Sequence, residues 1–474
     1  MMFNKTDIFN SNNFELNIKN LTNDLNDVFN DSDIKITNML NKINVKTRTR
    51  KITFSDALIY KFKYAQKHNT QKNIINDYKL DNNILCDNTS FYKKEQKIPL
   101  EYYDSIYEKV LNIFKKYSKK THHTIVAVDG TYNNTNYKKD YKLETTLNMG
   151  YYDITNNIPL ELDPIENKRN SEINSFIKII NEGKLETNNI IFVCDRAYFS
   201  YDLMNFLKNK NSKFVIRIKN NCKHLNETDL NETDKKVSTK KVSTKQVPIN
   251  TRFINYNFIK EYTKELTNKK TKQKEQYRIT EKVNCNIATN LDETYSDEDI
   301  KKIYNSRWNI EEYFKLIKSN MKFSIMKEHN KDTPTTYKKT YTIIKIISVL
   351  EQIFELMCDN ITENYNENYN VKINKSELIK GLFKIIPNII NSNLTHYQLT
   401  NFFNIYICLN FTKKDASNPR TSKIPFSKWY VKDYHNKYDL EKILEAYLDQ
   451  DKSETNINKN LKSKLKNYTF EKIT

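Results

Sequence analysis

Four side chains that can act on phosphate groups are regularly spaced in one short stretch of the chain: Tyr304, Arg307, Glu311 and Lys318. The stretch has a helix-like pattern. With roughly 3.6 residues per turn, a helix here places Tyr304, Glu311 and Lys318 on one stripe, with Arg307 one turn before the glutamate. An acid set among cations and a phenol can hold a metal ion while its neighbours bind phosphate.

Two aspartates farther upstream each follow a short apolar run. Asp129 follows residues 124–128 and Asp195 follows residues 190–194, and both runs have the composition of buried strands. Together with Glu311 they supply three hard oxygen ligands, which suit Mg²⁺ or Mn²⁺ and disfavour Zn²⁺. Two such ions stabilise the attacking and the leaving oxygen of a phosphodiester displacement. The sequence therefore predicts a metal-dependent nuclease.

These blocks and their order resemble the catalytic core of the DDE transposases, in particular the bacterial insertion-sequence branch with a Tyr-Arg-Glu-Lys signature. Val-Asp-Gly-Thr at residues 128–131 resembles the first aspartate block. Cys-Asp-Arg-Ala-Tyr at residues 194–198 resembles the second, and residues 214–219 resemble the strand that follows it. The resemblance extends from about residue 122 to about residue 330.

The resemblance implies an α/β fold with a ribonuclease H-like catalytic core and two Mg²⁺ or Mn²⁺ ions in each active site. Asp129 would bridge both ions, and Asp195 and Glu311 would each complete one. Water would cut at the ends of the element, and the freed 3′-hydroxyl would then attack target DNA. The implied partners are double-stranded DNA, as terminal repeats and as target, and a second copy of the chain in a homodimer on DNA.

The residues around the acids can be assigned to DNA by their reach. Lys318 lies two helical turns, about 10 Å, beyond Glu311, so it should bind a phosphate that flanks the one being cut. Arg307 is close enough to bind a phosphate beside the cut or to orient Glu311. Tyr304 can donate its hydroxyl to the DNA backbone. Trp308 also faces this stripe, where a buried packing role competes with a functional one.

Arginine is scarce in this lysine-rich chain, and two more arginines stand inside the resembling blocks. Arg196 directly follows the second aspartate, and Arg217 lies in the next expected strand. Lysine in their place would lose the planar fork that binds phosphate or carboxylate through two hydrogen bonds. We therefore expect Arg196 and Arg217 to contact DNA.

The pattern of apolar residues predicts three strands followed by alternating helices and strands, which is the ribonuclease H-like order. Asp129 and Asp195 would end neighbouring strands of one sheet. Glu311 would come later, on a helix capped by Ser296. The expected elements are strands at 124–129, 143–153 and 158–163, a helix at 171–183, a strand at 190–195, a helix at 200–210 and a strand at 213–219.

Six segments are expected along the chain. For the second, a role in recognising DNA ends competes with one in helical packing, and for the last, subunit pairing, DNA contact and packing all remain open. The segments are a partly ordered polar arm at 1–49, a helical DNA-binding module at 50–120, the first part of the core at 121–220, a β-rich insertion at 221–295 with a flexible repeat at 225–245, the second part of the core at 296–360 and a C-terminal region at 361–474.

Composition agrees with this reading without proving it. The formal net charge is +20, which favours a polyanionic partner, although some lysines can reflect coding drift in an AT-rich genome. The six cysteines have no paired spacing typical of zinc sites or disulfide frameworks. No apolar run approaches the roughly 18 residues that a membrane helix needs. We expect a soluble, intracellular, DNA-associated protein of nucleoid or nucleus, with no membrane partner.

Two other functions remain open. A domesticated, non-catalytic DNA-binding protein descended from a transposase would not need all three acids, yet all three are present. A ribonuclease H-like nuclease acting on RNA or in recombination would share the chemistry without needing the Tyr-Arg-Glu-Lys face.

Overall fold

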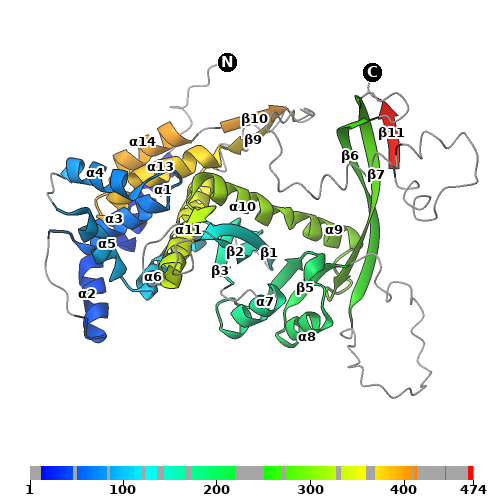
Figure 1. Cartoon of the computed structure of the whole chain (residues 1–474), viewed down its shortest axis with the longest axis horizontal. Coiled ribbons are helices and arrows are strands. Elements are labelled where there is room, and N and C mark those ends of the chain that lie inside the picture. The colour runs from blue at the N-terminus through cyan, green and yellow to red at the C-terminus, as the bar shows by residue number, and fades with distance from the viewer. Residues whose placement is uncertain are drawn as a thin grey trace, which may run out of the picture. The chain divides into compact units, whose positions relative to one another are not determined.

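The computed structural model forms two compact units, and Figure 1 shows their elements. The first unit comprises Met1–Ile216, Ser243–Thr251 and Asn290–Lys414, and the second comprises Arg217–Val242, Arg252–Thr289 and Asp415–Thr474. The structure describes residues 12–45, 51–82, 86–118, 123–135, 144–165, 172–218, 250–267, 274–326, 333–358, 369–407, 409–413, 444 and 468–472.

The first unit contains a mixed sheet with the strand order β5-β4-β1-β2-β3. Strand β1 runs antiparallel to β2 and parallel to β4, and β4 runs parallel to β5. Every residue of β4 is buried, as expected for a central strand covered on both faces. The elements are β1 (Thr124–Thr135), β2 (Glu144–Asp153), β3 (Ile158–Pro164), α7 (Glu172–Asn181), β4 (Ile190–Cys194), α8 (Tyr201–Asn209) and β5 (Lys213–Ile218).

The order of strands and helices in this region is the predicted one, and one strand is longer than expected. We expected β1 to end at Asp129, but it continues to Thr135 because β2 pairs with it along its whole length, down to Glu144. The short strand β8 (Ile325–Met326) pairs with the same extension. Asp129 therefore lies inside β1, although it follows directly on the last residue pair that β1 shares with β4.

The helix expected to carry Glu311 is interrupted. Ser296 caps α9 (Asp297–Ser306) as predicted, in a reciprocal capping box with Asp299. A second helix, α10 (Trp308–Asn320), then begins after Arg307. At this junction the amide of Arg307 donates to the carbonyl of Tyr304, three residues back, in the tighter pattern of a 3₁₀ turn. The expectation of one continuous helix was therefore wrong.

The N-terminal residues form helices where we expected a partly ordered arm over 1–49. Helices α1 (Asn12–Val28) and α2 (Ser32–Lys42) bury apolar side chains that recur every three or four residues. Examples are Ile18, Leu21 and Leu25, all at most 2% exposed. The high content of Asn, Asp and Lys pointed to disorder, but the spacing of the few apolar residues decides the structure.

The region at 50–120 is helical as expected but does not have a core of its own. Its helices share one hydrophobic core with helices from the C-terminal part of the chain. Helix α6 packs on α11, α3 packs on α13, and α1 packs on α14, and Figure 1 shows the blue N-terminal helices beside the yellow-green to orange C-terminal ones. The helices are α3 (Phe54–Ala65), α4 (Gln71–Asn82), α5 (Asn88–Gln96), α6 (Leu100–Tyr117), α11 (Thr333–Leu356), α13 (Lys375–Ile390) and α14 (His396–Tyr406).

A buried ion pair links an N-terminal helix of this core to a C-terminal one. The Nζ atom of Lys339 on α11 lies 3.5 Å from Oε1 of Glu95 on α5, and the two side chains are 4% and 1% exposed. The hydroxyl of Tyr103 donates to the same carboxylate oxygen at 3.2 Å. Lys339 also donates to the carbonyl oxygens of Glu95 and Gln96. The charges are thus paired and hydrogen-bonded, as burial requires.

The second unit contains a long antiparallel hairpin of β6 (Arg252–Thr267) and β7 (Lys274–Thr289). It lies where the β-rich insertion was expected. Strand β11 (Tyr468–Lys472), from far along the chain, pairs with the other edge of β7. The repeat at 225–245 lies outside the described residues. A two-stranded β9 (Tyr369–Ile373) and β10 (Leu409–Lys413) ribbon belongs to the first unit.

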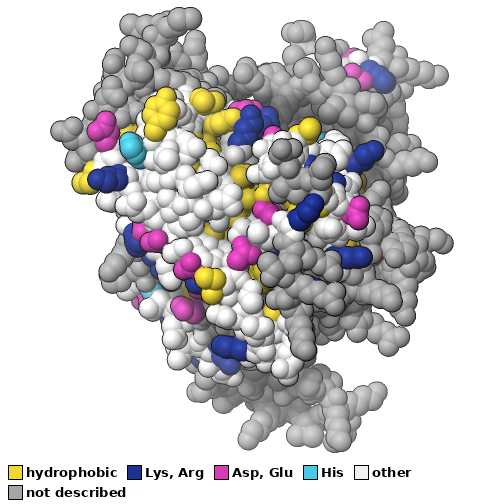
Figure 2. Space-filling view, turned by 90° about the vertical axis from the view of Figure 1, so that its left-hand side faces the viewer, with side chains coloured by type: hydrophobic (Ala, Val, Ile, Leu, Met, Phe, Trp, Pro, Cys, Tyr) yellow, Lys and Arg dark blue, Asp and Glu magenta, His cyan; other side chains and the backbone are white. Residues whose placement is uncertain are grey.

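The surface of the helical region carries mixed charge. On the face in Figure 2, the described Lys and Arg side chains are interspersed with Asp and Glu side chains. None of the described helices is long and apolar enough to cross a membrane.

We expect Glu95→Ala to lower the free energy of unfolding by about 3–5 kcal/mol, because it leaves the Lys339 ammonium buried without its carboxylate. The double variant Glu95→Leu with Lys339→Met removes both charges and should recover most of that loss. Chemical denaturation monitored by circular dichroism measures both. An equal loss in the single and double variants would contradict this account.

Candidate active site

The first two acids are brought together by strand register. Strands β1 and β4 are parallel, and Val128 pairs with Cys194 at the end of their shared ladder. Asp129 and Asp195 are the next residues on each strand. Because parallel strands point the same way, the two carboxylates leave the ladder at the same edge. The predicted proximity of Asp129 and Asp195 follows from this pairing.

The third acid is positioned by the packing of α10 on the sheet. Gly150 on β2 pairs with Asp129, and Phe314 of α10 lies so close to it that a Cβ atom there would stand 2.6 Å from the ring. Tyr313 stacks on Tyr152, also of β2, with ring centroids 4.7 Å apart. A glycine at position 150 lets the helix approach the strand, so that Glu311 reaches the neighbourhood of Asp129.

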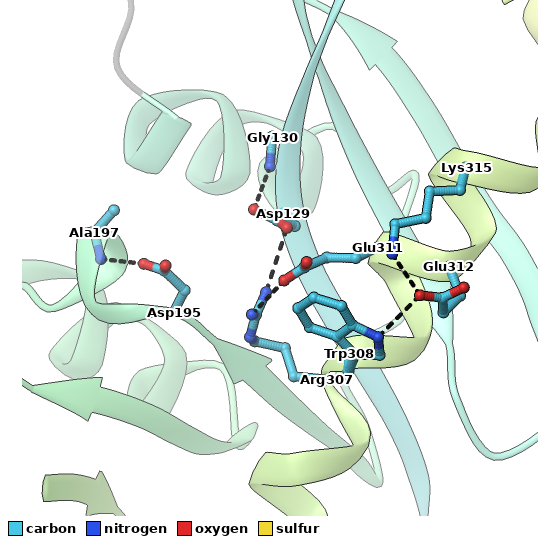
Figure 3. A network of polar contacts seen from close by, with 9 residues as sticks. All are labelled: Asp129, Gly130, Asp195, Ala197, Arg307, Trp308, Glu311, Glu312 and Lys315. Carbon is cyan, nitrogen blue, oxygen red and sulfur yellow. Dashed lines mark hydrogen bonds and ion pairs between the residues drawn. The ribbon is translucent and has the colours of Figure 1, made fainter. Parts of the chain in front are cut away.

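Arg307 lies between two of the acids. Its Nη1 atom lies 3.3 Å from Oδ2 of Asp129, and its Nη2 atom lies 2.6 Å from Oε1 of Glu311. Figure 3 shows the guanidinium between the two carboxylates. The arginine is only 14% exposed. Arg307 lies at the junction of α9 and α10, and from there its side chain reaches Asp129 on β1.

Asp195 is held differently. Its Oδ1 atom accepts a hydrogen bond from the amide of Ala197 and caps the single 3₁₀ turn Arg196–Tyr198. Figure 3 shows its carboxylate turned toward this amide. This hydrogen bond fixes the orientation of the Asp195 side chain.

Burial and the two neighbouring acids disfavour the ionised form of Asp129. Burial raises the pKa of Asp129 to about 6, and the charges of Asp195 and Glu311 add to this rise against the opposing effect of Arg307 and of the Gly130 amide. Burial alone would lower the pKa of Arg307, but its hydrogen bond to Glu311 and the charge of Asp129 reverse this and raise it. Burial raises the pKa of the Cys194 thiol, which stays neutral.

The donor types suit a divalent metal, but the side chains are not gathered around one point. Among the described residues, no group of three or more His, Cys, Asp and Glu side chains is arranged to hold a metal ion. At this site the guanidinium of Arg307 contacts both Asp129 and Glu311. Three carboxylates with a raised pKa at Asp129 remain the donor set that a hard cation would neutralise.

Lys318 and Tyr304 also lie on elements that adjoin the acids. The ammonium of Lys318 donates to Oγ1 of Thr131, two residues after Asp129 on β1, and burial lowers its pKa. Tyr304 is only 8% exposed and contributes to the raised pKa of Arg307. The structure therefore brings the lysine to the strand of the first aspartate and buries the tyrosine beside the arginine.

The remaining arginines differ in exposure. Arg196 is exposed on the turn that Asp195 caps, and Arg217 is half-buried on β5. Both stay predicted DNA contacts.

Trp308 is not buried, contrary to the packing role that we considered. It is 51% exposed, and its Nε1 atom donates to Oε1 of Glu312 at 2.9 Å. Lys315 donates to the same oxygen, and its ammonium lies 4.7 Å from the centre of the Trp308 ring. The contacts of Glu312 with Trp308 and of Thr131 with Lys318 were not predicted from the sequence. The four-residue spacing of Trp308 and Glu312 on a helix is the signal that could have indicated the first contact.

Comparison with known protein families covers these blocks. A family model described as a transposase DDE domain matches residues 95–332, which is half of the chain. Among solved structures, the chain is similar to a cryo-EM structure of the piggyBac transposase synaptic complex with hairpin DNA. The identity is 12%, the match covers 87% of this chain and 88% of that one, and the TM-score is 0.40. No curated protein matches the sequence.

The raised pKa of Asp129 predicts a stability cost in the metal-free protein. Because the folded state holds the proton more tightly than the unfolded chain, the ionised carboxylate lowers the free energy of unfolding above about pH 6. We expect Asp129→Asn to raise that free energy at pH 7.5 by about 1–3 kcal/mol. The gain should shrink as the pH falls through 6 and vanish near pH 4.

Urea denaturation in EDTA across this pH range measures the difference between variant and wild type. Asp77→Asn on the exposed face of α4 is the control, with an expected change within about 0.5 kcal/mol. A gain for Asp129→Asn that does not depend on pH would show that charge is not its cause.

Proposed function

The chain belongs to the transposase DDE domain family and is a DNA transposase, and from this premise we propose that Asp129, Asp195 and Glu311 are its catalytic acids. The observation that supports the proposal is that two independent features of the fold bring these three acids to the same region. The β1–β4 register brings the aspartates to one edge, and Arg307 links Glu311 to Asp129. Acids at these positions within the matched residues suit cleavage at transposon ends and strand transfer into target DNA.

The finer assignment is to the insertion-sequence branch with the Tyr-Arg-Glu-Lys signature, on a ribonuclease H-like core. Support comes from the strand order, with an antiparallel β1-β2-β3 group and parallel β1-β4-β5 strands. Further support comes from Lys318, seven residues after Glu311, which lies on α10 and contacts β1.

Asp129, Asp195 and Glu311 would hold two divalent cations, Mg²⁺ or Mn²⁺, since all three offer hard oxygen ligands. Bound there, the ions would stabilise the attacking and the leaving oxygen of the phosphodiester. The charges of Asp195 and Glu311 both contribute to the raised pKa of Asp129. This agrees with the bridging role that the resemblance gives to it.

Arg307 would have two partners in turn. In the structure it compensates Asp129 and Glu311. When cations take over that compensation, its fork of N–H donors becomes available for a DNA phosphate. Tyr304, buried beside it, would then position Arg307 rather than reach the DNA itself.

Lys318 would bind a phosphate that flanks the cut. It is seven residues from Glu311, about 10 Å along the helix, and it now donates to Thr131. That contact costs little to exchange, because a neutral hydroxyl is a weaker partner for an ammonium than a phosphate. The exposed Arg196 would contact the DNA backbone near Asp195, and Arg217 would add a DNA contact from β5.

The DNA partners would be the terminal repeats and the target, bound by a homodimer. End recognition by the helices at 50–120 remains part of the proposal. Because these helices share a core with α11 and α13, recognition would be a property of the whole first unit. A domesticated DNA-binding protein is the second candidate, and the presence of all three acids argues against it.

We expect Glu311→Gln to reduce Mg²⁺-dependent cleavage of a terminal-repeat duplex by at least about a hundredfold, because the transition state loses a charged metal ligand. Affinity for the duplex should change by less than about twofold. Glu298→Gln, an exposed acid on α9, is the matched control and should cleave at the wild-type rate. Normal cleavage by Glu311→Gln would rule out the assignment.

Arg307→Ala separates the two roles of that side chain. Without DNA, the variant should bind Mn²⁺ more tightly, because a competing cation has left two carboxylates. With DNA, its salt dependence should flatten by roughly one phosphate contact and its cleavage should fall. Electron paramagnetic resonance of free Mn²⁺ and duplex binding across salt concentrations measure these effects. Weaker Mn²⁺ binding by the DNA-free variant would contradict the first role.

A further inference from the structure

The end of α10 is held by residues from the N-terminal part of the chain. The segment that connects α3 to α4 lies against the residues that follow α10. Gln66 and Met321 form an antiparallel β-bridge, and the amide of Lys322 donates to the carbonyl oxygen of Ala65 at 2.7 Å. Met321 is fully buried and Ala65 is 1% exposed. The helix that carries Glu311 is therefore hydrogen-bonded to the helices at 50–120.

Lys67 supplies two of the hydrogen bonds at this end of α10. Its amide donates to the carbonyl oxygen of Asn320 at 3.1 Å, and its Nζ atom donates to the carbonyl oxygen of Lys318 at 2.8 Å. The last carbonyl groups of a helix have no donor within the helix, and a positive charge is favourable at that end of the helix dipole. Lys67 thus caps α10 from a position 251 residues earlier in the chain.

The segment that carries Lys67 is itself fixed in place. The Nδ2 atom of Asn69 donates to Oε1 of Gln66 at 2.8 Å. The Nζ atom of Lys322 donates to the carbonyl oxygen of Asn69 at 3.0 Å and lies 3.5 Å from the centre of the Tyr64 ring. These contacts do not involve the side chain of Lys67, so the segment should stay in place when that side chain is changed.

Helix α10 is anchored at two places, and the two anchors hold different functional residues. Phe314, three residues after Glu311, packs on β2. Four residues farther along, Lys318 is held at both of its ends, since its carbonyl accepts from Lys67 and its ammonium donates to Thr131. When the ammonium exchanges Thr131 for a DNA phosphate, the contact with Lys67 still holds the main chain at this position.

We propose that Lys67 is a positioning residue for the transposition reaction, which fixes the end of α10 so that Lys318 meets the phosphate flanking the cut. Lys67 acts through Lys318 and does not itself contact DNA. The inference rests on the role proposed above for Lys318. It also gives the helices at 50–120 a direct connection to the helix of the catalytic acid.

The test compares the salt dependence of terminal-repeat binding by full-length Lys67→Met, Lys318→Ala and the double variant. Each single variant should flatten the slope of log affinity against log salt by roughly one phosphate contact. The double variant should flatten it by the same amount, because both changes remove one shared contact. A double variant that loses about two contacts would show that Lys67 binds a phosphate of its own, and would overturn the proposal.

Lys109→Met is the matched control. Lys109 also donates from its Nζ atom to a carbonyl oxygen at a helix end, that of Val28 in α1, at 2.6 Å. Its effect on the slope, whatever its size, should add to that of Lys318→Ala. Lys67→Arg keeps a donor for the carbonyl of Lys318 and should restore the wild-type slope. Non-additive behaviour of Lys109→Met, or no restoration by Lys67→Arg, would contradict a specific role of Lys67.

A second measurement separates positioning from general damage to α10. Electron paramagnetic resonance of the DNA-free protein should show Mn²⁺ affinity within about twofold of wild type in Lys67→Met, because Phe314 anchors the helix independently near Glu311. Cleavage of the terminal-repeat duplex should fall about tenfold, since the DNA is held less accurately. A loss of Mn²⁺ affinity comparable to the loss of cleavage would overturn the proposal.

The single variants also distinguish this inference from the function on which it rests. An unchanged slope in Lys318→Ala would rule out the phosphate contact of Lys318, and the role of Lys67 would fall with it. A flatter slope in Lys318→Ala with an unchanged slope in Lys67→Met would overturn the role of Lys67 alone.

Discussion

Three carboxylates cannot share a half-buried site without a cation among them, and much of the first unit follows from this constraint. The register of β1 and β4 brings Asp129 and Asp195 to one edge, and the packing of Phe314 on Gly150 brings α10 close. Each placement adds negative charge to the same region. Arg307 compensates that charge in the structure, and its position at the junction of α9 and α10 is what gives it reach to both Asp129 and Glu311.

Local sequence patterns predicted much of the core and failed where distant contacts decide. Apolar runs before Asp129 and Asp195 gave the strands, and Ser296 gave the start of α9, because these signals involve neighbouring residues. The extension of β1 to Thr135 depends on pairing with β2, which the sequence of β1 does not reveal. The helical spacing around Glu311 predicted that Arg307 and Glu311 share a face, but it did not predict the junction at Arg307. That residue keeps helical backbone angles, so the spacing of the side chains on either side changes little.

The same limit explains what was missed in the helices and around the acids. Composition suggested disorder before residue 50, yet Leu21 and Leu25 of α1 are buried, and α1 packs on α6, α13 and α14. The partner of Lys318 was not foreseeable, because Thr131 lies 187 positions away. For Trp308 a buried packing role and a functional one both remained open, and the side chain is 51% exposed on α10.

The shared core of the N-terminal and C-terminal helices bears on how the chain is made. Glu95 and its partner Lys339 are 244 positions apart, so α5 leaves the ribosome long before the helix that covers it. At about 5–20 residues per second, that interval is on the order of 10–50 s. During this time the apolar faces of α3 and α6 have no partner from α11 or α13. The nascent chain is therefore prone to aggregation during this interval. We expect chaperones that bind apolar helices to raise the yield of folded protein.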